Sequence, residues 1–392
     1  MSGRRRLDSL WDIYGAPLVL VAACIVTIVA VARRPDAGTT DFRTFYQSGH
    51  QYLANTDPYV PFDPERGPNL NPPWVVAIMA QLCRAPLPVA VAVWWAFSFV
   101  CLFGAIALIV RAVAPGQAVA LASLVLVTQA AYSNLRLGQV AWPLMLLMTA
   151  AWLADRSRRP LLCGVLLGIA ASWKPFLLVF VPYLIWRREW RALVAMTGTA
   201  VVTGVIGLVA VGLGGYASWF ASLRLVGWAG HPLNASLRGV ISRALAMPAL
   251  LEQHTTPIVS APQWLDAVWV AISVIVSAIT IVRVVVRHDI DAGWAGLALL
   301  ALLVSPLGWV HYVPIATGPL VAAVLDGRRR ALRPAVVGWL LLCVPFAWLK
   351  GATFGPLLTL TVASSYGWGT LLLLAAVLRS AKSGRSASAS VG

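Results

Sequence analysis

Apolar runs of near-membrane length recur along almost the whole chain, and they constrain its fold more than any other feature. A spanning helix takes roughly 20 mostly apolar residues, and charges, proline and glycine mark where such runs end. The runs lie near 15–32, 86–110, 117–132, 140–154, 161–173, 175–186, 192–213, 263–282, 294–310, 312–325, 334–349 and 357–378. The pattern predicts an all-α integral membrane protein with about twelve transmembrane helices, and the short runs indicate broken or partly crossing helices.

Composition supports this class and excludes others. Mean hydropathy is +0.79 and 11% of residues are charged, whereas a soluble domain buries its core with far less apolar sequence. The basic residues behind the net charge of +16 are dispersed over short loops, so we expect no nucleic-acid partner. The five cysteines lack metal-ligand spacing, and no phosphate-binding loop is present. We therefore expect no metal and no cofactor.

The arginine clusters predict the orientation. Arg156–Arg159, Arg187–Arg191 and Arg328–Arg333 fall in short loops, where positive residues favour the cytoplasmic side. Both termini are then cytoplasmic in the plasma membrane, and the first run is a retained helix, not a cleaved signal peptide. We expect residues 1–378 to form one membrane domain. Within it, the extracytoplasmic loops 33–85 and 214–262 carry short interfacial helices, and 379–392 form a disordered cytoplasmic tail.

Asp41 opens the first of these long loops, within Asp41-Phe42-Arg43-Thr44-Phe45-Tyr46. A carboxylate close to the membrane surface and flanked by aromatics is either a solvated loop charge, which can pair with Arg43, or a catalytic or ion-handling group. Asp57 is the rival carboxylate, but the adjacent Pro58 favours a turn-making role.

Other distinctive polar residues fall on the same predicted side. Lys174 precedes Pro175 between two apolar runs, so it is either an anion-binding cation beside free backbone donors or a snorkelling lysine at a helix end. Arg238 and Arg243 break the positive-inside pattern, which suggests a function or an acidic partner. Asn234 lies in the same loop, Gln139 lies in an outer turn, and His311 joins two short apolar runs.

These motifs, in this order, resemble those of glycosyltransferase family 87. The resemblance covers the chain from about residue 18 to about residue 378, and the histidine pair common in the family is here His311-Tyr312, which leaves the role of Tyr312 open. The features that carry it are Asp41 with Tyr46, Asp57-Pro58-Tyr59, Asn71-Pro72-Pro73, Gly138-Gln139, Lys174-Pro175, Asn234-x-Ser236-Leu237 with Gly239 and Arg243, and Ser305-Pro306 with Trp309 and His311.

The resemblance implies a GT-C type helix bundle with an extracytoplasmic active site. It implies a polyprenyl-phosphate sugar donor and a glycolipid or lipoglycan acceptor, such as a phosphatidylinositol mannoside, in actinobacterial envelope synthesis. Members commonly form α-mannosyl linkages, and an inverting reaction gives an α product from a β-linked donor. A phosphate leaving group requires no metal.

On this reading the residues take distinct roles. Asp41 is the general base for the acceptor hydroxyl. Lys174, His311, Arg238 and Arg243 are candidates to bind the donor phosphate. Tyr46, Asn234, Gln139 and Arg43 are candidates to bind the sugar or the acceptor.

Besides a non-catalytic scaffold in envelope assembly, which would leave the ordered motifs of the predicted outer side unexplained, two alternatives stay open from the sequence. The first is transfer of arabinofuranose or glucose from the same type of donor, since no sugar-specificity pattern is readable. The second is a flippase or transporter of lipid-linked sugars, which the number of spans suits. Against transport, the chain shows no inverted repeat, and its polar groups gather on one side instead of at mid-membrane.

Overall fold

The computed structural model describes residues 40–61, 67–113, 125–224, 227–246, 257–285, 289–349 and 354–380. Every named element within these residues is helical, which confirms the all-α prediction. The predicted first span at 15–32, most of the predicted span at 117–132 and nearly all of the predicted tail lie outside the described residues.

Three described helical segments are long and apolar enough to cross a membrane: Leu87–Ala112, Trp190–Arg224 and Pro262–Val284. The latter two leave most of their apolar surface exposed, as helices facing lipid do, and side chains such as Val209 (83% exposed) would be costly in water. Other apolar helices are shorter, including Pro160–Trp173 and Pro175–Trp186, as the short runs predicted. These helices indicate an integral membrane protein. The predicted number of about twelve transmembrane helices stays a prediction.

The chain forms two compact units. One holds the described residues between Ile13 and Leu108 and between Ala131 and Gly227, and we call it the Asp41 unit. The other holds those between Ile109 and Ala130 and from Trp228 onward, and we call it the His311 unit.

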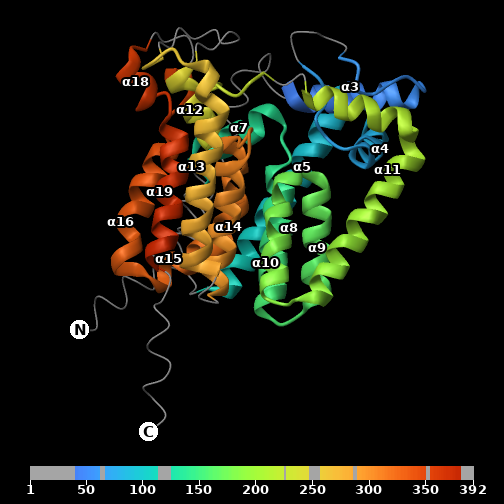
Figure 1. The fold of residues 1–392 in the computed structure, drawn as a ribbon. Coiled ribbons are helices and arrows are strands. Elements are labelled where there is room, and N and C mark those ends of the chain that lie inside the picture. The colour runs from blue at the N-terminus through green and yellow to red at the C-terminus, as the bar shows by residue number, and fades with distance from the viewer. Residues whose placement is uncertain are drawn as a thin grey trace, which may run out of the picture. The chain divides into compact units, whose positions relative to one another are not determined.

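The Asp41 unit is built around the hairpin of helices α8 (Ala141–Arg156) and α9 (Pro160–Trp173) (Figure 1). Two glycines of α9, four residues apart, let this helix approach α11 (Trp190–Arg224) closely. A Cβ at Gly164 would lie 2.1 Å from the nearest atom of α11, and a Cβ at Gly168 would lie 2.6 Å from it. The helices of this unit are α3 (Thr40–Leu53), α4 (Pro73–Leu82), α5 (Leu87–Ala112), α8 (Ala141–Arg156), α9 (Pro160–Trp173), η3 (Pro175–Val179), α10 (Phe180–Trp186) and α11 (Trp190–Arg224), and α7 (Gln129–Leu137) precedes the hairpin.

Helix α11 changes direction at Gly212, whose backbone is non-helical with φ 68°. Its last part turns across the end of the unit near α3 and α4 (Figure 1). There Trp219 packs with Tyr59 and Val76. The Ser218 hydroxyl donates to the Asp57 carboxylate at 2.5 Å, so the segment after α3 is held by α11.

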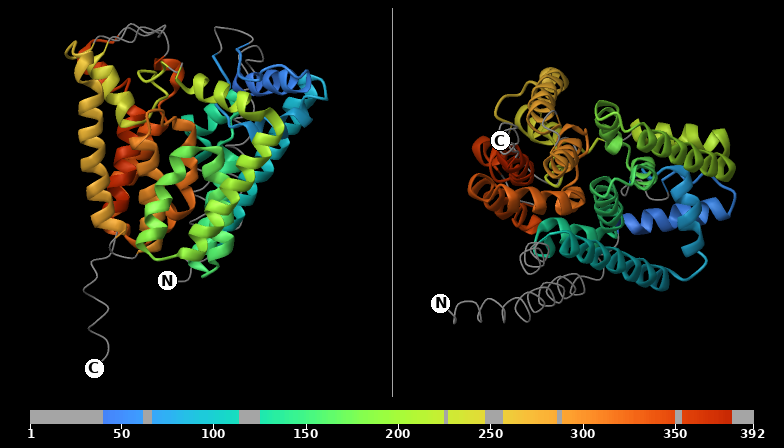
Figure 2. Two further views of the ribbon diagram at one scale, coloured as in Figure 1. Left: turned by 45° about the vertical axis from the view of Figure 1, so that its right-hand side comes forward. Right: turned by 90° about the horizontal axis from the view of Figure 1, so that it is seen from below.

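The His311 unit is a bundle in which α13, α14, α16 and α19 run alongside one another (Figure 2). A short helix, α12, packs against α13 and α18 near one end of the bundle. Its elements are α12 (Leu237–Leu245), η4 (Pro262–Trp264), α13 (Leu265–Thr280), η5 (Ile281–Val285), α14 (Ile290–Val304), η6 (Val310–Ala316), α15 (Thr317–Asp326), α16 (Arg328–Leu342), α17 (Phe346–Leu349), α18 (Pro356–Leu360) and α19 (Ser365–Ser380).

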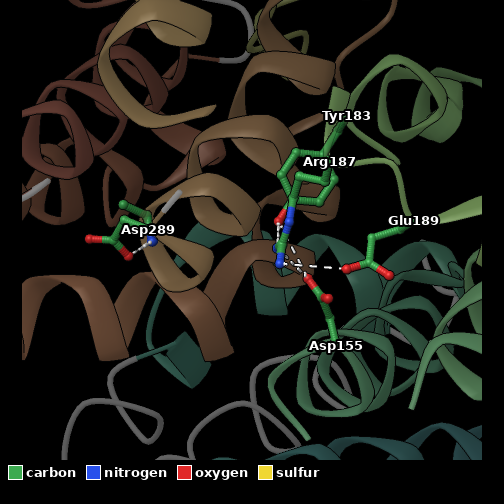
Figure 3. Close-up of polar contacts among 6 residues, drawn as sticks. Asp155, Tyr183, Arg187, Glu189 and Asp289 are labelled. Carbon is green, nitrogen blue, oxygen red and sulfur yellow. Dashed lines mark hydrogen bonds and ion pairs between the residues drawn. The ribbon is translucent and has the colours of Figure 1, made fainter. Parts of the chain in front are cut away.

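A nearly buried ion pair closes the turn end of the α8–α9 hairpin. Arg187 donates to the Asp155 carboxylate at 3.0 Å and to the Tyr183 hydroxyl at 2.6 Å, and Glu189 lies 3.9 Å away (Figure 3). The Asp155 and Arg187 side chains are about one-tenth exposed. The pair joins the ends of α8 and α10, in two segments that the arginine pattern assigns to the same side of the membrane.

Removing one partner of this pair leaves the other charged and poorly solvated. We expect Asp155→Ala to destabilise the fold by about 3 kcal/mol, seen as a lower melting temperature of the purified protein in detergent. Glu189→Ala is the matched control, because Glu189 is longer-range and more exposed, and its cost should stay below about 1 kcal/mol. Equal melting temperatures for the two variants would contradict a stabilising role of the Asp155–Arg187 pair.

Candidate active site

The hairpin places two of the predicted site residues at one end of the Asp41 unit. Gln139 lies just before α8 begins at Ala141, and Lys174 is the residue directly after α9 ends at Trp173. Because α8 and α9 form a hairpin through the short 157–159 turn, the start of one and the end of the other lie at the same end. Residues 35 positions apart in the sequence therefore face one region.

Asp41 completes this group from a third segment. It lies in the first turn of α3 and not in a loop, and its Oδ2 accepts a hydrogen bond from Gln139 Nε2. Lys174 is close enough to act electrostatically on the carboxylate. No ion pair joins Asp41 to Arg43, both of which the structure describes, so the paired loop acid considered from the sequence is not what forms.

Gly138 makes the contact between Asp41 and Gln139 possible. Its φ of +69° favours glycine, and a Cβ on it would stand 2.6 Å from Cβ of Phe42. Phe42 is fully buried and stacks on Trp94, whose Nε1 donates to the Gly138 carbonyl at 2.9 Å. This close approach brings the start of α3 against the 138–139 turn, where the Gln139 amide meets the carboxylate.

Lys174 is fixed by a residue that sequence reasoning did not assign to the site. Its Nζ donates to Oδ1 of Asn71 at 3.1 Å, and Asn71 is in turn bonded to Asn69 through its backbone and side-chain nitrogens. Trp74 donates to the Ser172 carbonyl at 3.2 Å and thereby ties α4 to the end of α9. The signal for Asn71 was the Asn71-Pro72-Pro73 motif, but nothing in the sequence indicates that Lys174 is its partner.

Burial changes the acid–base properties of both charged groups, which lie outside the apolar helices. Although Asp41 keeps some exposed surface, its carboxyl is surrounded by protein, and desolvation raises its pKa to about 6 against the opposing effects of the Gln139 hydrogen bond and Lys174. Desolvation lowers the pKa of Lys174 to about 8, partly offset by Asp41. At neutral pH both groups are mainly charged, and Asp41 is a stronger base than an exposed aspartate.

The Asp57 carboxylate is not part of this group, because both of its oxygens accept hydrogen bonds from other residues. Its Oδ1 accepts from the Tyr59 backbone N–H at 2.9 Å, which is an Asx turn, and its Oδ2 accepts from Ser218. The turn-making role predicted for it is confirmed. Tyr46 is also engaged, because its hydroxyl donates to the Ala85 carbonyl at 2.8 Å.

In the His311 unit, Asn234 braces two loop segments. Its Nδ2 donates to the carbonyls of Ala229 and Pro306, and its Oδ1 accepts from the N–H groups of Ser236 and Gly308. The side chain is fully buried and both amide protons are used. Through these hydrogen bonds, Asn234 positions the segment that precedes His311.

The two arginines near Asn234 differ in their surroundings. Arg238 forms an ion pair with Asp266 at 2.9 Å, which is the acidic partner that the sequence suggested. Arg243 is fully buried, and its guanidinium donates to Ser364 and to the carbonyls of His231 and Asn234. Desolvation lowers the Arg243 pKa. Arg243 thus supports the backbone around Asn234.

His311 lies in η6, where it is 2% exposed. Its ring stacks on Trp309 with centroids 6.1 Å apart, and Tyr312 meets it edge-on at 4.5 Å. Asn234 and Trp309 also form a backbone bridge, so the bracing loop and the histidine segment are joined. Within the described residues, no group of three or more His, Cys, Asp or Glu side chains has the arrangement of a metal site.

Apolar helices of membrane length, together with a desolvated carboxylate beside a lysine, define an integral membrane protein with a candidate general base. The chain matches glycosyltransferase family 87 over residues 69–306, more than half of its length, and belongs to that family. The resemblance seen in the order of the motifs is confirmed. The matched range includes Gln139, Lys174 and Asn234, whereas Asp41 and His311 lie outside it.

A relative from Mycolicibacterium smegmatis (strain ATCC 700084 / mc(2)155) is 30% identical over 217 residues, which are 51% of this chain and 45% of the relative. It is a polyprenol-phosphate-mannose-dependent alpha-(1-2)-phosphatidylinositol mannoside mannosyltransferase. The similarity therefore spans about half of each protein. No solved structure matches the chain.

Substituting Gly138 tests how α3 is positioned. We expect Gly138→Ala to destabilise the fold by at least about 1 kcal/mol, because an L-residue is strained at this φ and its Cβ collides with Phe42. The measurement is the melting temperature in detergent. Gly198→Ala is the control, since a Cβ there meets nothing within 4 Å. A Gly138→Ala variant as stable as the control would show that the close approach is dispensable.

Proposed function

We propose that the protein is an inverting glycosyltransferase that moves mannose from a polyprenyl-phosphate donor to a hydroxyl of a glycolipid or lipoglycan acceptor. The observation that carries the proposal is that the Asp41 carboxylate is hydrogen-bonded by Gln139 and lies within electrostatic range of Lys174. Family membership and the activity of the mycobacterial relative support the reaction class and the donor. The relative's phosphatidylinositol mannoside acceptor supports a phosphatidylinositol-based glycolipid as the acceptor of this protein.

Asp41 acts as the general base in this proposal. The ionised carboxylate accepts the proton of the acceptor hydroxyl while that oxygen bonds to the anomeric carbon. The bond between the anomeric carbon and the phosphate oxygen breaks, and its electron pair leaves with the polyprenyl phosphate. Attack from the face opposite the phosphate converts a β-linked donor into an α-linked product.

Gln139 and Lys174 both lower the pKa of Asp41, the proposed base. The Gln139 amide favours the ionised carboxylate and fixes its orientation. Lys174 also favours ionisation, and its ammonium group is the cation of this unit that we assign to the departing phosphate, where negative charge accumulates. Asn71 holds the ammonium group in place through a hydrogen bond to its Nζ.

For the His311 unit we propose a narrower set of roles. His311 is the candidate to bind phosphate, whereas Asn234 and Arg243 act as positioning residues that shape its loop. Arg238, paired with Asp266, contributes to the surface around α12.

We further propose that the reaction takes place on the extracytoplasmic side, with both termini in the cytoplasm. Asp41, Gln139 and Lys174 all lie in segments that the arginine pattern assigns to the outside, and they meet at one end of the hairpin. The Asp155–Arg187 pair, from segments assigned to the inside, lies at the other end.

Replacing the proposed base tests the reaction directly. Asp41→Asn keeps the size of the side chain but cannot accept the proton, so we expect transfer to fall at least about 100-fold. The assay is transfer of labelled mannose from polyprenyl-phosphate mannose to mycobacterial membrane glycolipid by the purified protein. Asp266→Asn, at an exposed carboxylate, is the control and should stay close to wild-type activity. Near-normal transfer by Asp41→Asn would assign the base elsewhere.

Lys174→Met removes the charge and retains much of the apolar stem. We expect weaker donor binding and slower turnover together, because the cation contacts the phosphate in both the bound donor and the transition state. Steady-state kinetics with varied donor concentration measures both effects. A variant with unchanged donor affinity would remove Lys174 from the phosphate site.

The pH dependence of transfer follows from the same pair. Since Asp41 must be ionised and Lys174 protonated, kcat/KM should fall below about pH 6 and above about pH 8. Gln139→Leu removes a hydrogen bond that lowers the Asp41 pKa, so the acidic limb should move to higher pH. An acidic limb that stays in place in this variant would separate Asp41 from the observed ionisation.

A further inference from the structure

Helix α3 has a second polar face that the proposed reaction does not use. At 100° per residue, Arg43, Gln47 and His50 lie on one side of the helix, and Asp41 and Phe45 lie on the other. Phe42 and Phe45 are buried, which seats the Asp41 side against the protein. The Arg43 side is partly exposed and faces a cavity.

This cavity measures about 570 Å³ and is bordered mainly by side chains of α3 and of the turn that follows it. None of the lining residues that the structure describes is acidic, and two of them, Arg43 and His50, have basic side chains. The polar lining residues are Arg43, Tyr46, Gln47, His50, Gln51 and Thr56.

Several of these side chains form contacts with neighbouring residues in the wall of the cavity. The Tyr46 hydroxyl donates to Ala85, and the Tyr46 ring packs edge-on against His50 with centroids 4.6 Å apart. Gln51 Nε2 donates to the Val60 carbonyl at 3.0 Å, and Thr56 donates to the Gln51 carbonyl at 3.0 Å. These bonds shape the cavity without occupying its cationic side.

The cationic side retains unused donors. Arg43 Nε is buried and has no hydrogen-bond partner among the described residues. Its guanidinium forms no ion pair, and the Gln47 amide makes no hydrogen bond, within that same part of the chain. A buried N–H without a partner is costly, and a guanidinium offers paired donors that match phosphate oxygens. An amide beside it suits a hydroxyl group.

Apolar groups stand next to this polar lining. Leu53, the last residue of α3, is 37% exposed, and Val60, whose carbonyl receives the Gln51 bond, is 56% exposed. In a membrane protein, a cationic recess next to exposed aliphatic side chains fits a ligand that has a charged head and an apolar tail.

We propose that this cavity binds the phosphate of a lipid headgroup, with Arg43 as the main anion-binding residue and Gln47 and His50 as its polar partners. The site is distinct from the transfer site, because Asp41 lies on the opposite face of α3. It does not depend on the proposed transfer reaction. A lipid held here ties α3, and with it the position of Asp41, to the membrane surface.

Binding of short-chain lipids to the purified full-length protein in detergent tests the proposal. The probes are dioctanoyl phosphatidylinositol, dioctanoylglycerol, which lacks phosphate, and inorganic phosphate, each titrated in a thermal-shift or fluorescence assay without sugar donor. We expect saturable binding of the phosphatidylinositol and at least about tenfold weaker binding of the other two. Equal binding of inorganic phosphate would make this a free-phosphate site, and equal binding of dioctanoylglycerol would make it a site for apolar tails. Either result overturns the proposal.

Variants locate the binding. Arg43→Met should weaken phosphatidylinositol binding at least about tenfold, whereas Arg84→Met should leave it unchanged, because Arg84 is an exposed arginine of the same unit outside the cavity lining. Gln47→Leu provides a second test if Arg43→Met does not fold, with an expected loss of several-fold. Undiminished binding by the folded cavity variants overturns the assignment. Since no sugar is transferred in these measurements, their outcome is separate from that of the proposed function.

Discussion

The Asp41 unit depends on one constraint, which is that the two helices of the α8–α9 hairpin must bring together the ends that lie away from the 157–159 turn. Gln139 precedes the first helix and Lys174 follows the second, so closing the turn at residues 157–159 brings both to the same place. Helix α8 has 16 residues and thus a length of about 24 Å. The hairpin therefore keeps the Asp155–Arg187 pair and the Asp41 group at opposite ends, with apolar sequence between them.

Electrostatics explains why such a cluster can serve as a chemical site. A carboxylate and an ammonium group that both lose hydration move their pKa values toward neutrality, and their mutual attraction limits the shift. Asp41 thus stays mainly ionised near neutral pH while being a better proton acceptor than an exposed aspartate. Asn71 and Gln139 hydrogen-bond the two charged groups and hold their orientation.

The His311 unit uses polar residues differently. Asn234 and Arg243 resemble substrate-binding residues in sequence, yet their donors go largely to backbone carbonyls of the surrounding loops. Buried backbone groups in irregular segments need such partners, because no regular ladder satisfies them. The bracing holds the segment in which His311 packs against Trp309 and Tyr312.

The sequence by itself determined the helical class, the break at Lys174, the turn at Asp57 and the family, because these follow from local apolar runs, proline chemistry and motif order. It also singled out Asp41, Gln139 and Lys174, but only as separate residues on one predicted side. The tertiary structure decided that Gln139 bonds Asp41, that Asn71 holds Lys174 and that Arg43 faces a cavity on the other side of α3. Those contacts join segments up to about a hundred residues apart, and they depend on the packing of Phe42 against Gly138 and on the hairpin geometry, neither of which is a property of any local stretch of sequence.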